Sequence, residues 1–395
     1  MSLRHLLISI FKVLYFLPMH QGRSIPWTLV AISLLTMLLL ILGISGISRG
    51  DELATWGEYA PRQTMWMFFA AFAMFGSLFV PYRQLKEWAY PALVATIVLL
   101  VAVYFFPPRN GARRWISLGF MFLQPSELAK VAYILAISRY LMFRENHRTF
   151  LGLVVPFLMT CLPVLLILRE PDLGTSLLFF PVLFAVLFVA GAKFRHLGAT
   201  LLAGIAVLPL LWSVMSVEQK SRVTTVFLQV DEGEPQTGDG YHLWQSKQML
   251  ALGGVWGSSV TGMPLDDPAA YRLPAGRTDF VFCLIGEKWG LPGTLAVLVI
   301  FTGFCLSGLQ IAAKTRDPFG RLIATGVVAM IGTQALINMA MTVGLAPITG
   351  LTLPLLSYGG SSLVTTCLGI GLLANVALRP GYDVAGQPFQ FAKSA

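Results

Sequence analysis

The sequence predicts an all-α polytopic membrane protein with about ten transmembrane helices. Hydrophobic residues make up 56% of its 395 residues and charged residues only 12%, whereas about 25% of the residues of a soluble domain are charged. Several apolar stretches reach the roughly 20 residues that cross a bilayer. No polar block is long enough to form a soluble domain, so residues 1–395 are expected to form one integral-membrane domain.

The apolar stretches follow one another along the chain, and most are joined by short links. The first is too long for the apolar core of a signal peptide and no small-residue cleavage motif follows it, so we expect it to be a retained span. One long connection, from about 217 to 288, separates the seventh span from the eighth. The ten predicted spans cover residues 27–48, 64–81, 88–107, 124–143, 151–168, 173–192, 196–216, 289–313, 321–344 and 357–378.

Lysine and arginine residues orient these spans. With the N-terminus inside, the inner segments hold more of them than the short outer loops do, as the positive-inside rule requires. Both termini are then cytoplasmic, as an N-terminal segment (1–25) and a tail (380–395), and the 217–288 connection is extracytoplasmic. The net charge of +9 mainly reflects this orientation. The expected surroundings are membrane lipid and not nucleic acid, because no basic helix or aromatic-interleaved patch is present.

The predicted outer loops contain more residues of the kinds that bind ligands or take part in catalysis than the inner loops do. Glycine, proline, hydroxyl and charged residues gather in the predicted outer loops, while the inner loops read as short basic turns. We therefore expect one composite site at the outer surface. No metal site is predicted, because His242 has no second histidine or cysteine at ligand spacing. The four cysteines lie in or beside apolar runs and are interpreted as core residues.

The first outer loop carries "NGARRWISLG" and leads into "FLQPSELAK". Arg114 beside Trp115 is either an interfacial anchor or a phosphate-binding guanidinium. Glu127 and Lys130 share a helix face three residues apart. Ionisable groups inside a span are costly and usually face a polar cavity, so this pair is either a helix-packing salt bridge or part of the site.

The next outer loops add further candidates. In "LREPDLGTS", Asp172 is either a helix cap or a holder of a neighbouring cation. "GYHLWQSKQMLALGG" reads as an amphipathic helix on the outer surface. In "LTLPLLSYGGSS", the small and hydroxyl residues around Ser357 favour helix packing, with ligand contact as the alternative.

Asp279 lies at the mouth of an apolar run, in "RLPAGRTDF". Desolvation would raise its pKa, while Arg277 and other cations would lower it. A poorly hydrated carboxylate of this kind suits a general base. The alternative is a capping or salt-bridged aspartate.

Taken together, these motifs resemble the SEDS (shape, elongation, division, sporulation) family of bacterial membrane proteins. The matching stretches include "GARRWISLG", "LQPSELAKVA", "EPDLGTS", "GYHLWQSK", "LPAGRTDFVFCLIGEKWG" and "LTLPLLSYGGSS". The resemblance extends over nearly the whole chain beyond the first 25 residues, and "YHLWQSK" favours the RodA-like subgroup. The sequence departs from the family pattern in "AGR" before "TDF" and in "MPLDDPAAYR".

The resemblance implies a peptidoglycan glycosyltransferase that polymerises lipid II at the outer face of the cytoplasmic membrane, with a class B penicillin-binding protein as partner. It implies that Asp279 is the essential carboxylate. The substrate-binding candidates in the matching stretches are Arg114, Trp115, Glu127, Lys130, Asp172, Gln245, Lys247, Arg277 and Ser357. The sequence leaves open whether Mg²⁺ or Mn²⁺ accompanies the substrate pyrophosphate.

Two other classes of function compete with this interpretation. A flippase or permease for a lipid-linked substrate also fits ten spans and an intramembrane Glu–Lys pair. Against it, the charged residues gather at one face, and no inverted pair of broken helices is evident. A scaffold that only positions a crosslinking enzyme is the third alternative.

Overall fold

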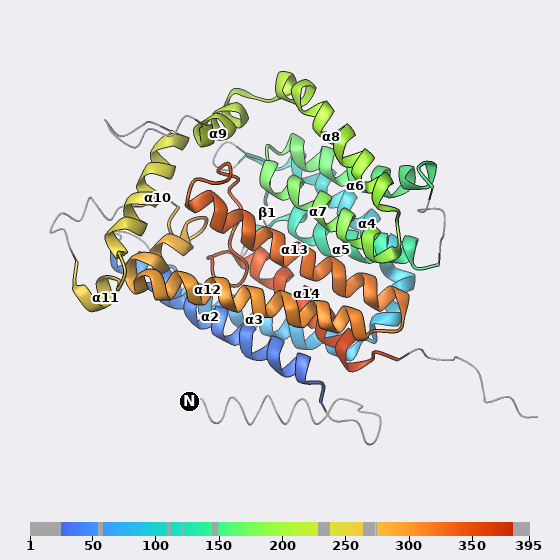
Figure 1. Ribbon diagram of the computed structural model, residues 1–395, viewed down its shortest axis with the longest axis horizontal. Coiled ribbons are helices and arrows are strands. Elements are labelled where there is room, and N and C mark those ends of the chain that lie inside the picture. Colours follow the sequence, from blue (N-terminus) through green and yellow to red (C-terminus); the bar gives the residue numbers. More distant parts are fainter. Residues whose placement is uncertain are drawn as a thin grey trace, which may run out of the picture.

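The computed structural model describes residues 25–53, 58–108, 112–117, 119, 122–143, 149–227, 238–263, 273 and 275–381. Most of the predicted N-terminal segment (1–25) and tail (380–395) lie outside the described residues. Figure 1 shows a bundle of helices with one small hairpin. In chain order the elements are α2 (Trp27–Leu53), α3 (Ala60–Phe79), η1 (Tyr82–Gln84), α4 (Leu85–Ala102), η2 (Val103–Phe105), β1 (Ile116–Ser117), β2 (Phe122–Leu123), α5 (Pro125–Leu141), η4 (Leu151–Leu153), α6 (Val154–Arg169), α7 (Leu173–Ala190), α8 (Phe194–Val214), α9 (Val217–Phe227), α10 (Asp239–Gly253), α11 (Ser258–Thr261), α12 (Val281–Lys314), α13 (Pro318–Thr342) and α14 (Gly360–Leu378).

Seven helical segments among the described residues are long and apolar enough to cross a membrane. This confirms the predicted all-α polytopic class. Helices α3, α5 and α8 occupy the other three predicted spans but do not belong to that set. The number of ten spans therefore stays a prediction.

Close backbone approaches pack the bundle. A Cβ atom on Gly371 of α14 would lie 2.5 Å from the Met74 carbonyl of α3, and one on Gly43 of α2 would lie 2.7 Å from the Leu356 Cα. Small residues at such positions are how membrane helices gain van der Waals contact, since lipid provides no hydrophobic drive between them. Helices α5, α13 and α14 are buried over most of their residues and form the interior.

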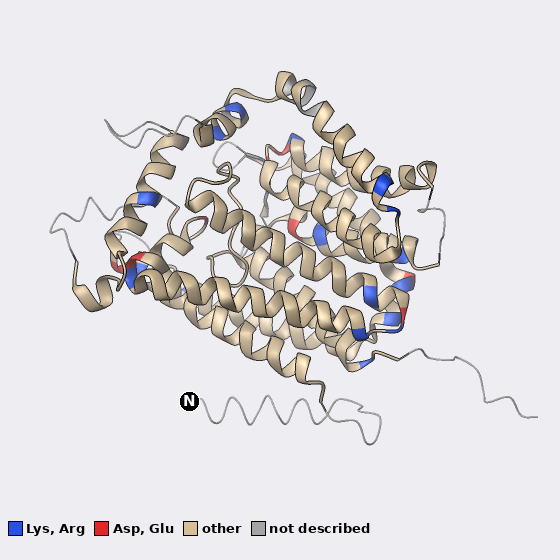
Figure 2. Ribbon diagram, in the orientation of Figure 1, with Lys and Arg blue, Asp and Glu red and all other residues tan. Residues whose placement is uncertain are grey.

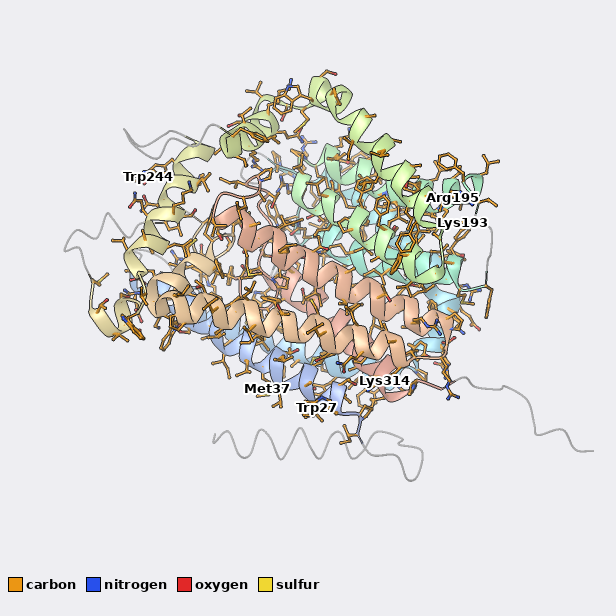
Figure 3. The ribbon with its side chains drawn as sticks, viewed as in Figure 1. Trp27, Met37, Lys193, Arg195, Trp244 and Lys314 are labelled. Carbon is orange, nitrogen blue, oxygen red and sulfur yellow. The ribbon has the colours of Figure 1, made fainter. Side chains whose placement is uncertain are left out.

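Charged residues gather towards the ends of the bundle, and most of the helical length between is uncharged (Figure 2). Figure 3 shows Lys193, Arg195 and Lys314 at one end, where the predicted inner loops fall. Trp244 of α10 lies at the opposite end. These labelled residues thus lie at opposite ends of the bundle, and the assignment of the loops to the two faces of the membrane stays a prediction.

Helix α12 corrects one predicted boundary, because it begins at Val281 and not at 289. The additional helical part contains the charged residue Glu287, whose two carboxylate oxygens Arg49 of α2 binds at 2.7 and 2.8 Å. Gly290 interrupts the helix with φ 63° and ψ −152°. A Cβ atom there would lie 2.4 Å from the Val255 carbonyl oxygen, so only glycine fits this close crossing.

The chain between α13 and α14 is non-helical, and much of it is buried within the bundle. Leu351, Leu353 and Leu356 of this connecting segment (343–359) are each no more than 3% exposed. Irregular backbone at membrane depth is tolerated only where protein or a wet cavity satisfies its polar groups. Side chains from several helices do so here, as the site shows.

Candidate functional site

Asp279 lies in the turn that delivers the chain into α12. The backbone N–H groups of Thr278 and Asp279 donate to the Ala275 carbonyl at 3.1 and 3.0 Å, which closes the turn. Asp279 is partly exposed, while the next residue, Phe280, is buried. The carboxylate thus lies beside the N-terminal end of α12, where the helix dipole favours negative charge.

Helix α13 and the connecting segment hold Asp279 in place. The side-chain amide of Asn338 donates to the carbonyl oxygens of Asp279 and Leu351, at 2.7 and 2.6 Å. A Cβ atom on Gly350 would lie 3.8 Å from Asp279 Oδ2, so the connecting segment passes next to the carboxylate. The position of Asp279 therefore depends on residues 59 or more places further along the chain.

The surroundings of Asp279 raise the pKa of its carboxyl group to about 6, chiefly because burial of that group disfavours its charged form. The negative charge of Asp172 acts in the same direction. The Thr278 hydroxyl and the positive charges of Arg222 and Arg114 oppose the shift. Arg114, Arg222 and Asp172 thus act on Asp279 electrostatically, although they come from three distant parts of the chain.

A second polar network reaches the site from α5. Lys130 Nζ lies 3.0 Å from both carboxylate oxygens of Glu127 and donates to Gln334 Oε1 at 3.0 Å. Gln334 in turn donates to the Thr352 carbonyl at 2.8 Å. Glu127 and Lys130 are each 4% exposed, so this is a buried ion pair that is completed by an amide.

Gln334 and Asn338 join the two networks. They are four residues apart on α13 and therefore share one helix face about 6 Å apart along the axis. One binds Lys130 and the connecting segment, and the other binds Asp279 and the same segment. The sequence analysis did not select them. Their signal was two amides one turn apart in an apolar span, a pattern that indicates interhelical hydrogen bonding.

Arg114 and Trp115 lead into the hairpin of β1 and β2, in which Ile116 pairs with Leu123. The hairpin is attached to the start of α14, because the Ser361 hydroxyl donates to the Phe122 carbonyl at 3.0 Å. Arg114 donates from Nε to the Glu170 carbonyl at 3.0 Å and from Nη2 to the Pro171 carbonyl. Within the part of the chain that the structure describes, its Nη1 has no acceptor.

Asp172 caps α7, which is one of its two predicted roles. Its carboxylate accepts from the Thr175 backbone N–H at 3.1 Å, from the Thr175 hydroxyl at 3.0 Å and from Gln124 at 3.3 Å. Gly174 packs directly on the connecting segment, since a Cβ atom there would lie 2.7 Å from the Thr349 carbonyl oxygen. The α6–α7 turn is thereby brought against the segment that passes Asp279.

Arg277 is paired with α2 and the start of α3. Its Nη1 donates to Asp51 Oδ1 at 2.7 Å, and its guanidinium lies 4.3 Å from the centroid of the Tyr59 ring. Its backbone carbonyl accepts from the Tyr358 N–H at 2.9 Å. Arg277 thus ties the Asp279 turn to α2 and to the connecting segment.

The three remaining candidates lie on two elements. Ser357 is buried and its hydroxyl accepts from the Leu353 N–H at 2.8 Å, so it shapes the connecting segment. Gln245 and Lys247 lie on α10, the first buried and the second partly exposed. The hydroxyl of Ser246, between them, donates to the Thr342 carbonyl at 2.9 Å, which docks α10 against the end of α13.

Asn338→Leu is expected to lower the stability of the folded protein by roughly 1–3 kcal/mol, because a buried and a partly buried carbonyl oxygen, those of Leu351 and Asp279, lose their donor. Thermal unfolding of the detergent-purified protein measures the change. Gln310→Leu, at an exposed position on α12, is the matched control and should leave the midpoint unchanged. Equal midpoints for the two variants would show that the Asn338 bonds do not hold the site together.

Comparison with known proteins places this arrangement in a family. The family model of FtsW, RodA and SpoVE, described as cell cycle proteins, matches residues 23–380. A Geobacter metallireducens protein named "Probable peptidoglycan glycosyltransferase FtsW" is 35% identical over 329 residues, covering 81% of this chain and 85% of the relative. The peptidoglycan glycosyltransferase MrdB of Escherichia coli K12 is 34% identical over 302 residues, covering 75% and 80%.

A solved structure agrees with the sequence relatives. It concerns a peptidoglycan synthase complex that coordinates polymerization and crosslinking, and one of its chains matches with a TM-score of 0.74 at 30% identity, covering 90% of this chain and 98% of that chain. Relatives named FtsW and MrdB are about equally similar, so the RodA-like subgroup stays a prediction. Because the family model covers nearly the whole sequence, the chain belongs to the FtsW/RodA/SpoVE family of cell cycle proteins, as the resemblance to the SEDS family implies.

Proposed function

We propose that the protein is a peptidoglycan glycosyltransferase that polymerises lipid II into β-1,4-linked glycan strands at the outer face of a bacterial cytoplasmic membrane. The activity is supported by relatives that are named peptidoglycan glycosyltransferase and that are 34–35% identical to this chain over three quarters or more of its length. The observation that supports the site most directly is Asp279, a partly exposed residue before α12 whose carboxyl group has a pKa raised by burial, at a place where Arg114, Arg222 and Asp172 act on it.

In this proposal Asp279 is the general base. It accepts the proton of the C4 hydroxyl on the acceptor sugar, and that oxygen attacks the anomeric carbon of the donor strand. The pyrophosphate leaves from the opposite face, which turns an α-linked donor into a β-1,4 bond. A base whose pKa lies near the working pH is efficient, and such catalysis contributes about 10²–10⁴-fold.

Cations must supply further stabilisation, because general-base help falls short of most enzymatic rate enhancements. Arg114, Lys130 and Arg277 are the proposed sources of positive charge for the pyrophosphate. Arg114 is the best placed, since Lys130 and Arg277 already have acidic partners while Arg114 retains an unpaired Nη1 among the described residues. Preorganised charge of this kind is worth several kcal/mol.

A divalent cation would be bound chiefly through the substrate. No group of three or more His, Cys, Asp or Glu side chains among the described residues is arranged to hold a metal ion. Mg²⁺ typically binds through substrate phosphates with few protein ligands. In our proposal any Mg²⁺ or Mn²⁺ ion that takes part would be bound through the lipid pyrophosphate.

The proposed protein partner is a class B penicillin-binding protein, which crosslinks the new strands. The similarity to a chain of a peptidoglycan synthase complex supports this pairing. Together, the two proteins would make and join glycan strands for elongation or shape of the cell wall.

The pH dependence of the reaction tests the proposal. Because the base must be ionised, the initial rate of polymerisation from purified lipid II should rise with pH and level off above about 6, the pKa of Asp279. One pH unit below that value, about a tenth of the molecules carry the ionised base, so the rate should fall about tenfold. A rate that is flat from pH 5 to 7 would exclude Asp279 as the base.

The competing transporter hypothesis predicts a different result in the same assay. A flippase needs two separated compartments and makes no glycan in detergent micelles. Polymer formed by the detergent-purified protein alone would therefore exclude a function limited to transport. Its complete absence, with folding intact and a penicillin-binding protein present, would instead contradict the proposed enzyme.

A further inference from the structure

Glu170 is a buried acidic residue to which the proposed reaction gives no role. It ends α6 in the turn to α7, outside the membrane-spanning helices, and is 0% exposed. Its backbone N–H donates to the Ile167 carbonyl at 3.0 Å, and its own carbonyl accepts from Arg114 Nε. Neither carboxyl oxygen has a hydrogen-bond partner among the described residues.

The ionisable groups around Glu170 come from η2, the end of α6, the chain before β1 and the cap of α7, and none of these groups bonds its carboxyl group. The Tyr104 hydroxyl, in η2, donates to the Leu166 carbonyl, and the Arg169 guanidinium lies 5.6 Å from the centroid of the Tyr104 ring. Arg114 binds backbone carbonyls, and Asp172 binds Thr175 and Gln124. An ionised carboxylate without a partner is costly in such surroundings.

The chemistry of this pocket favours the neutral acid. The pKa of Glu170 is raised to about 8, first because burial disfavours the charged form and then because Asp172 repels it, while Arg114 acts in the opposite direction. At neutral pH most molecules therefore carry an uncharged Glu170. Raising the pH through about 8 places a negative charge next to Arg114.

Arg114 is the group that would respond to this charge. Its guanidinium is held by two neutral carbonyl oxygens, those of Glu170 and Pro171. Arginine binds a carboxylate through charge-assisted, often bidentate bonds that are about twice as strong as neutral ones. An ionised Glu170 thus competes directly for the guanidinium.

We propose that Glu170 is a positioning residue that works as a neutral acid and so keeps Arg114 directed at the substrate pyrophosphate. When Glu170 loses its proton to solvent, the Arg114 guanidinium turns from the two carbonyls to the carboxylate, and lipid II binds more weakly. This inference rests on the proposed function. It assigns the alkaline limb of the pH profile to Glu170, as the acidic limb is assigned to Asp279.

The test is the pH profile of kcat/KM for polymerisation of purified lipid II by the full-length protein and three variants. The unsubstituted protein should lose about tenfold between pH 7.5 and 9, one unit above a pKa of about 8, mainly through KM. Glu170→Gln should keep its pH 7.5 activity within about threefold and lose less than twofold at pH 9. Glu87→Gln, at an exposed position on α4, should retain the full alkaline loss.

Glu170→Met serves if the glutamine variant fails to fold, because it is also uncharged and leaves no polar group unpaired. It too should be insensitive to alkaline pH. An unchanged alkaline loss in the folded Glu170 variants would overturn the inference, as would a loss of more than tenfold at pH 7.5. If the unsubstituted protein makes no polymer at any pH, the proposed function itself fails.

Discussion

Asp279→Asn is expected to reduce polymerisation of purified lipid II by about 10²–10⁴-fold, the usual contribution of a general base. Asparagine has a side chain of the same size, and the backbone carbonyl that accepts from Asn338 is unchanged. Its amide cannot accept the proton. The loss should therefore appear in kcat, with little change in KM. Initial rates with saturating lipid II, at a pH well above 6, measure it.

Two controls separate chemistry from folding in this variant. Glu58→Gln makes the same kind of change at an exposed acidic residue before α3, and its rate should be that of the unsubstituted protein. The thermal midpoint of Asp279→Asn should be equal or slightly higher, since an aspartate whose pKa is raised by burial gains from losing its charge. Polymerisation within about threefold of normal would remove Asp279 from the base role.

Lys130→Met is expected to lower the stability of the folded protein by about 3–5 kcal/mol, because it strands the Glu127 carboxylate among buried residues. Methionine fills a similar volume, so the loss reports the missing charge more than a cavity. Thermal unfolding in detergent measures it. Lys314→Met, at an exposed position, should have almost no effect.

The double variant Glu127→Gln, Lys130→Met decides whether the ion pair is the cause. Replacing both partners removes the stranded charge, and such replacements are often nearly neutral in stability. Most of the lost stability should therefore return. A double variant as unstable as Lys130→Met alone would show that the hydrogen bond from Lys130 to Gln334, and not the ion pair, dominates.

Much of the fold could be predicted because composition and apolar length decide it. All ten predicted spans overlap helices of the structure. The part of α12 before residue 289 was not included in the predicted span, and it holds the charged residue Glu287, which has a distant partner. Arg49, which neutralises it, lies 238 positions earlier, and no local pattern reports such a distant pairing.

The loop residues of the candidate site could be predicted from the sequence, but the α13 side chains that hydrogen-bond around them could not. Asp279, Arg114 and Asp172 were selected because each breaks the apolar pattern at an outer loop, and in the structure the charges of Arg114 and Asp172 act on Asp279. Gln334 and Asn338 were missed because they are uncharged amides inside a predicted span, where helix packing is the ordinary role of an amide. Arg277 shows a further limit, since its sequence neighbour is Asp279 while its bound partner is Asp51.

The buried connecting segment has a consequence for how the protein is made. It supplies contacts to α2 at Gly43, to α7 at Gly174 and to the Asp279 turn at Tyr358, yet it is synthesised after all three of these partners. During synthesis the earlier helices are therefore present before the connecting segment, and the surfaces that it will contact lack their packing partner. A chain that ends before residue 343 has Asp279 but lacks the connecting segment that contacts its turn, so the Asp279 turn can reach its final packing only after residues 343–359 have been made.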